Sequence, residues 1–161
     1  MFDILSLLSS SVFVTFLVAA YLGLVLGSFA TAIIYRTRHN QSWIWNNKSN
    51  NGNKGRSFCP SCHHVLGLRD LIPVFSYLWQ KGRCRYCTVR ISSSYLLTEL
   101  LSLLICFIIV FFLGLTIQAL LLMFLSPFLL SQIILGVKYK IISPLLLGLI
   151  VCGAGAYFIL F

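Results

Sequence analysis

The stretch YLLTELLSLLICFIIVFFLGLTIQALLLMFLSPFLLSQIIL, residues 95–135, decides the fold class of this chain. It contains a single charged residue, Glu99, and one short polar break near residues 114–116 divides it into two apolar runs. Each run approaches the ~20 residues that a helix needs to cross the hydrocarbon core of a bilayer. We therefore predict two membrane-spanning helices here, at about 95–114 and 117–135.

Similar apolar runs before and after this stretch extend the prediction. We expect further spans at about 8–34 and 141–160, and so an all-α integral membrane protein with about four transmembrane helices. The composition agrees, because 59% of the 161 residues are hydrophobic, 9% are charged and the mean hydropathy is +0.95. These values exclude a water-soluble globular domain. The first run has no basic segment before it, so we expect a retained helix and not a cleaved secretory signal.

Basic residues are confined to two stretches. Ten of the 12 Lys and Arg lie within residues 36–90, and the other two are Lys138 and Lys140. Because cytoplasmic loops retain Lys and Arg, we predict both stretches in the cytoplasm and both termini outside. The predicted organisation is a first helix (1–35), a cytoplasmic loop (36–93) and three further helices (94–161). In a soluble protein, 12 basic against 3 acidic residues would suggest nucleic acid, but here the topology accounts for the excess.

Two C-x-x-C pairs lie in the predicted loop, and their thiols are those of Cys59, Cys62, Cys84 and Cys87. Two residues between thiols allow both sulfurs to face one ion, and two such pairs complete a tetrahedral shell. Disulfides are rare in the reducing cytoplasm, so we interpret the four thiols as ligands of a structural Zn²⁺. Replacement of one thiol by His63 or His64 remains an alternative. A closed shell of four thiolates leaves no position for a substrate.

Other segments of the loop and the spans carry weaker patterns. Residues 65–79, between the cysteine pairs, are too apolar for a free loop, and we expect them to pack on the membrane surface or the helix ends. Residues 37–57 are Asn-rich, contain Trp43 and Trp45, and predict a mobile insert. Small residues at four-residue spacing in the first span predict close helix packing, within the chain or in a dimer; they are Ala19, Gly23, Gly27 and Thr31. Cys106 and Cys152 lie inside spans, where a lone cysteine usually serves as a small hydrophobe.

A series of short motifs resembles one membrane family. The motifs are Gly27-Ser28-Phe29, Ile34-Tyr35-Arg36, the two cysteine pairs, Asp70-Leu71-Ile72-Pro73 with Ser76-Tyr77, Gly82-Arg83-Cys84, Ile91-Ser92 and Glu99-Leu100-Leu101. In this order they resemble the N-terminal half of the type IV prepilin leader peptidase/N-methyltransferases (peptidase A24-type), over roughly residues 20–150. The resemblance implies a zinc-bound cytoplasmic loop in an enzyme of the bacterial inner membrane. That enzyme would cleave the leader of prepilin-like proteins and methylate the new N-terminus with S-adenosylmethionine, for type IV pili, type II secretion or competence.

The resemblance also implies two intramembrane aspartates, and here the sequence departs from the family. Gly136 occupies the position of the first aspartate, and the second would fall beyond Phe161. Aspartic hydrolysis needs two carboxylates in one site, one ionised to activate water and one protonated to polarise the carbonyl. We therefore expect no aspartic peptidase activity from this chain alone.

Three acids are present that could substitute for these aspartates. Asp3 is predicted on the outer side, away from a cytoplasmic leader. Glu99 stands where the membrane begins, which makes it a functional candidate, with an ion pair to Arg36 or Arg90 as the structural alternative. Asp70 is a second candidate that could instead organise the turn before Pro73.

Three hypotheses remain open. The chain could supply the zinc-loop half of a family enzyme, retaining methyl transfer or receiving its aspartates from a second chain. It could be a non-catalytic pseudoenzyme that binds pilins or assembles with a partner. It could also be a membrane-tethered zinc-knuckle reader of nucleic acid, which the topology disfavours. The expected partners are prepilin-like substrates and membrane lipid, and nucleic acid is not expected.

Overall fold

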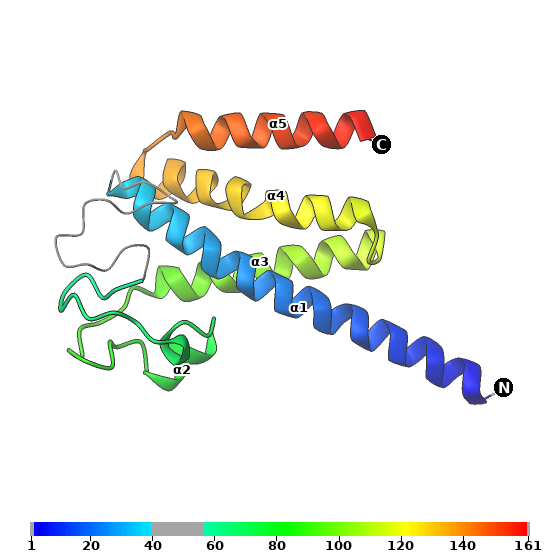
Figure 1. Ribbon diagram of the computed structural model, residues 1–161, viewed down its shortest axis with the longest axis horizontal. Coiled ribbons are helices and arrows are strands. Elements are labelled where there is room, and N and C mark those ends of the chain that lie inside the picture. The colour runs from blue at the N-terminus through cyan, green and yellow to red at the C-terminus, as the bar shows by residue number, and fades with distance from the viewer. Residues whose placement is uncertain (1, 40–56, 161) are drawn as a thin grey trace.

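The computed structural model describes residues 2–39 and 57–160 (Figure 1). The element order is α1 (Phe2–Arg38), the 3-10 helix η1 (Leu68–Asp70), α2 (Phe75–Trp79), α3 (Ser93–Leu113), α4 (Ile117–Ile134), the π-helical turn η2 (Leu135–Tyr139) and α5 (Pro144–Leu160). These residues form no strand beyond two isolated β-bridges, which confirms the all-α class. The Asn-rich insert with Trp43 and Trp45 lies largely outside the described residues.

Three helical stretches are long and apolar enough to cross a membrane: Val12–Arg38, Ser93–Leu113 and Ile117–Tyr139. The fourth expected span is α5, a shorter apolar helix of 17 residues. It begins later than predicted because Lys140 takes a left-handed conformation (φ 55°) and because Pro144 disfavours helix in the residue before it. At the end of α1, Arg36 and Arg38 extend the helix past the predicted boundary, where their charge complements the helix dipole.

The small face of α1 packs against α3 of the same chain. A Cβ on Gly23 would lie 2.8 Å from the Cα of Leu103, and one on Gly27 would lie 2.8 Å from the Cα of Glu99. Ala19, one turn earlier, is fully buried. Backbones this close leave no room for a larger side chain, so the intramolecular alternative for the small-residue pattern is the one the structure adopts.

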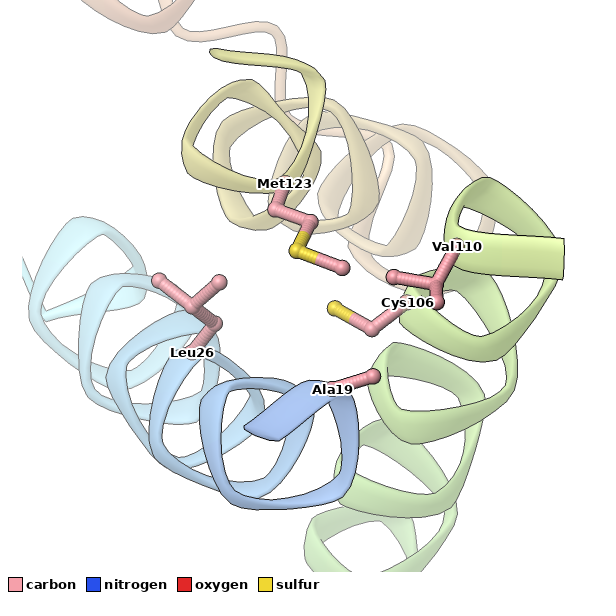
Figure 2. Close-up of a cluster of buried hydrophobic side chains, with 5 residues drawn as sticks. All are labelled: Ala19, Leu26, Cys106, Val110 and Met123. Atoms are coloured by element: carbon pink, nitrogen blue, oxygen red, sulfur yellow. The ribbon is translucent and has the colours of Figure 1, made fainter. Parts of the chain in front are cut away.

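The bundle core joins three helices. Figure 2 shows Ala19 and Leu26 from α1, Cys106 and Val110 from α3, and Met123 from α4 converging on one buried cluster. Cys106 is fully buried there among apolar side chains, in the role of the small hydrophobe that its position predicts.

The arrangement of the helices brings the described parts of both basic stretches to one end of the bundle. Figure 1 shows the end of α1, the start of α3, η2 and the start of α5 gathered at that end, beside the cysteine-containing loop. The N-terminus, the α3–α4 turn and the C-terminus lie at the opposite end. At the basic end the Ser131 hydroxyl of α4 donates to the Pro127 carbonyl of its own helix at 2.6 Å and also lies 3.3 Å from the Ala30 carbonyl of α1, so α1 and α4 are in close contact there.

Candidate metal centre and adjoining cavity

The first cysteine pair is presented by a tight loop, residues 57–66. Three backbone hydrogen bonds close it: from Cys59 to His64 (3.0 Å), from His63 to Cys59 (2.9 Å) and from Leu66 to Ser57 (2.9 Å). His63 adopts a positive φ of 56°, a conformation that a non-glycine residue takes at a cost. The reversal it produces turns the chain back within a few residues and places both thiols on one side.

The second pair repeats this loop 25 residues later, in residues 82–91. The corresponding bonds run from Cys84 to Val89 (2.8 Å), from Thr88 to Cys84 (2.9 Å) and from Ile91 to Gly82 (2.8 Å). Thr88 stands at the position of His63 with a φ of 57°. Apart from the two cysteines, the loops share no residue at matching positions, so the sequence shows the repeated C-x-x-C pairs but not the repeated backbone bonds around them.

The four thiols come together at one point. The sulfurs of Cys59, Cys62, Cys84 and Cys87 all lie within 4.8 Å of one another. The Sγ atoms of Cys59 and Cys87 are 3.8 Å apart, and a tetrahedral Zn²⁺ with bonds of about 2.3 Å places its sulfurs about 3.8 Å apart. The four thiols therefore fit a zinc ion.

The two histidines considered as replacement ligands belong to other contacts. His63 stacks on Phe58 with ring centroids 6.1 Å apart, and His64 lies against Tyr86 at 3.6 Å. In the described part of the chain, the cluster capable of holding a metal consists of the four cysteines.

The surroundings of the thiols give them unequal acidities. Burial raises the pKa of Cys59, but the backbone N–H groups of Cys62 and Ser61 and the neighbouring thiols stabilise its thiolate, and the pKa falls to about 7. At Cys87 the Val89 N–H lowers the pKa, but burial and the neighbouring thiols outweigh it and raise the pKa to about 12. Four thiolates in so small a volume repel one another, and a divalent cation removes that repulsion.

Asp70 connects three parts of the loop. Its carboxylate accepts hydrogen bonds from the Gly67 N–H (3.0 Å), the Gln80 side chain (2.9 Å) and the Tyr86 hydroxyl (3.4 Å). These donors come from the start of η1, the end of α2 and the second cysteine loop. This arrangement fits the structural alternative for Asp70, since its oxygens organise the loop around Pro73.

Glu99 connects the loop to the helix bundle. Its Oε2 accepts a hydrogen bond of 2.7 Å from the backbone N–H of Val74, which stands immediately before α2. Val74 has a φ of 62°, an unfavourable conformation for a β-branched residue. A main-chain amide is thus a partner of Glu99, whereas the sequence suggested the side chains of Arg36 or Arg90, and no residue pattern marks such a donor in advance.

A cavity of about 730 Å³ lies between the loop and the helix ends. Both acids border it, together with groups from α1, α2 and η2; they include Ser28, Thr31, Tyr35, Tyr77, Lys138 and Tyr139. On the η2 side, Arg38 lies over the Tyr139 ring at 4.6 Å and the Lys138 ammonium bonds to the Ser94 hydroxyl. The cavity is therefore polar and basic along this wall.

Gly136 lies in the same η2 turn, between the buried Leu135 and the exposed Val137. A Cβ built on it would meet nothing within 4 Å. The position has room for a side chain, and the glycine there is not required by packing.

Comparison with known proteins matches residues 21–113 to the model of the bacterial peptidase A24 N-terminal domain. A prepilin leader peptidase/N-methyltransferase from Vibrio cholerae is 34% identical over 95 residues, covering 59% of this chain and 37% of that protein. One from Myxococcus xanthus is 42% identical over 86 residues, covering 53% and 23%. A type 4 prepilin-like proteins leader peptide-processing enzyme from Escherichia coli is 37% identical over 91 residues, covering 51% and 34%. The matched stretch thus spans well under half the length of these relatives. No solved structure matches the chain.

Proposed function

Since this chain belongs to the family of the bacterial peptidase A24 N-terminal domain, we propose that it binds prepilin-like proteins at the cytoplasmic face of the bacterial inner membrane. The observation that carries the proposal is the cavity of about 730 Å³ between the cysteine loop and the ends of the helices. A prepilin joins a basic leader to an apolar helix, and this cavity offers carboxylates beside a membrane-embedded bundle. The systems served are type IV pili, type II secretion or competence.

The zinc ion in this proposal is structural. Held by Cys59, Cys62, Cys84 and Cys87, it crosslinks the two repeated loops and so fixes the wall of the cavity that they build. Its four positions are filled by thiolates, and the contacts to the prepilin come from the protein's own side chains.

Asp70 and Glu99 supply the acidic groups of the cavity. Both carboxylates are oriented by donors of the loop, and a carboxylate held in this way still attracts a basic side chain at its free lone pairs. The leader would therefore lie along the side of the cavity formed by the loop, away from the basic η2 wall.

We further propose that the described part of the chain does not hydrolyse the leader by itself. By the resemblance, Gly136 would take the position of a family aspartate, and the two acids on the cavity wall are engaged in holding the loop together. The aspartates would be contributed by a second chain, which makes this protein a binding and assembly partner. N-methyl transfer, an activity in the names of the relatives, is tested in the same experiment with S-adenosylmethionine as the methyl donor.

The test uses the full-length, zinc-loaded chain in lipid nanodiscs, mixed with a purified prepilin that carries its leader and apolar helix. We expect the prepilin to bind, with no leader release and no release by the Gly136→Asp variant. Binding should weaken in Asp70→Asn, with zinc content unchanged. Leader release by the unaltered chain would overturn the non-catalytic part, and absence of binding by a folded, zinc-loaded chain would overturn the whole.

Methyl transfer is scored by label moving from S-adenosylmethionine to a pre-cleaved pilin in the same nanodiscs. Labelled pilin that requires the four cysteines would identify the chain as a methyltransferase, and the binding-module proposal would then be wrong. Unlabelled pilin alongside measurable binding supports the binding module.

A further inference from the structure

The loop carries an unusual set of exposed apolar side chains. Leu68 is 88% exposed, Phe75 is 65% exposed and Trp79 is 90% exposed, and Ile72 and Leu78 lie exposed between them. We call these five residues the apolar edge of the loop. Exposed apolar residues concentrated in one short segment, here residues 68–79, and not scattered singly, mark a surface that contacts something other than water.

The bond between Val74 and Glu99 fixes the position of this edge along the bundle. Glu99 is six residues beyond the start of α3 at Ser93, which is about 9 Å along the helix axis. With 21 residues, α3 is about 31 Å long, close to the thickness of the hydrocarbon core. The first turns of α3 therefore lie where headgroups meet acyl chains, and Figure 1 shows α2 beside these turns.

Backbone N–H groups at the start of α2 are bonded within the protein, as surroundings poor in water require. The Val74 N–H is bonded to Glu99, the Ser76 N–H to Ile72 (3.0 Å) and the Leu78 N–H to Val74 (3.0 Å). Backbone donors without partners are strongly disfavoured once water is removed. Here the carboxylate of a spanning helix satisfies a donor at the start of α2.

Basic side chains flank the apolar edge on the loop. Arg69 follows Leu68 directly, and Lys81, Arg83 and Arg85 come soon after Trp79, all four being exposed. Apolar side chains bordered by Arg and Lys are the pattern that anionic phospholipids attract, and exposed tryptophan favours the headgroup level.

We propose that residues 68–79 form a membrane-interface anchor. The apolar edge enters the headgroup region of the leaflet nearest the loop, the flanking basic residues contact anionic phospholipid, and Glu99 sets the depth through Val74. The inference rests on the membrane-spanning helices and not on prepilin binding, so either can fail without the other.

The test measures how close Trp79 lies to lipid. The full chain with Trp43→Phe and Trp45→Phe, which leaves Trp79 as its sole tryptophan, is placed in vesicles of phosphatidylglycerol and phosphatidylethanolamine. Some vesicles carry bromine near the headgroup end of the acyl chains and others near the bilayer centre. A face buried about 5–10 Å past the headgroups predicts the loss of about half of the emission with shallow bromine and less with deep bromine.

The matched control places the sole tryptophan inside the bilayer. In a background with all three native tryptophans replaced by phenylalanine, Phe124→Trp reports from the lipid-facing side of α4, where the exposed fraction is 60%. Its emission should be quenched more by deep bromine. Circular dichroism and zinc content confirm that both variants are folded.

Trp79 emission unaffected by either bromine and fully quenched by iodide in the water would overturn the anchor. Trp79 that becomes protected from iodide only when prepilin is added would also overturn it, because the edge would then be a protein-docking surface. Preferential quenching by shallow bromine, without prepilin, supports it.

Discussion

Replacing Glu99 with alanine isolates the contact that joins the loop to the bundle. The substitution removes the acceptor of the 2.7 Å bond from Val74 and leaves that amide without its partner. A hydrogen bond to a charged group contributes about 1.5–3 kcal/mol, which corresponds to a factor of about 10–100 in the equilibrium between attached and detached loop. Neither Val74 nor Glu99 belongs to the cluster of four cysteines, so zinc content should stay unchanged while the loop opens more often.

Amide hydrogen exchange measures this opening directly. In Glu99→Ala, the Val74 amide should exchange about 10–100 times faster than in the unaltered chain, because exchange requires the bond to open. Glu99→Gln is the matched control, since its amide oxygen still accepts from Val74 without a charge, and we expect an intermediate rate. The reasoning would be refuted by a Val74 exchange rate that is the same in all three proteins while each remains folded.

Three further predictions concern the metal, the aspartate position and the helix crossing. Zinc affinity should fall as the pH is lowered, because protons compete for the thiolates, and the fall should steepen below about 7, where Cys59 binds a proton in addition to Cys87 with its pKa of about 12; titration against a chelator at several pH values measures it, and a flat profile would contradict the thiolate site. Gly136→Asp should fold normally, because a Cβ there meets nothing within 4 Å. A leader-release assay of this variant should remain negative, because only one of the two aspartate positions expected from the family is then filled. Gly27→Ala should lower the free energy of unfolding by about 1–3 kcal/mol, because its Cβ would meet the Glu99 Cα at 2.8 Å. Gly155→Ala, which meets no atom within 4 Å, is its control and should be neutral or slightly stabilising in the same unfolding titration in detergent.

The spanning helices were predictable because their signal is local. Twenty apolar residues in a row indicate a span whatever the rest of the chain does, and the glycines of α1 gave its packing face from spacing alone. The thiol cluster was predictable for a similar reason, since two C-x-x-C pairs constrain four sulfurs toward one ion. Helix ends were less accurate, because the left-handed Lys140 and the turn before Pro144 depend on how the chain leaves η2.

The remaining features of the site depend on the main chain. The bonds that make the two cysteine loops alike join backbone atoms, and their side chains differ at every position except the cysteines. Val74 gives Glu99 an amide, which every residue except proline possesses, so nothing in the sequence singles it out. Gln80 and Tyr86 bond to Asp70 across segments distant along the chain, and such pairings appear only once the loop is folded.

Glu99 belongs to two contacts at once. Its Cα lies opposite Gly27, at one of the two positions where the α1 and α3 backbones come close, while its carboxylate holds the loop at Val74. A displacement of α1 against α3 at this crossing is therefore transmitted, through a single residue, to the wall of the cavity. The α1–α3 pair and the loop wall of the cavity would therefore move together. A change in bilayer thickness or a force on α1 would then alter the shape of the cavity.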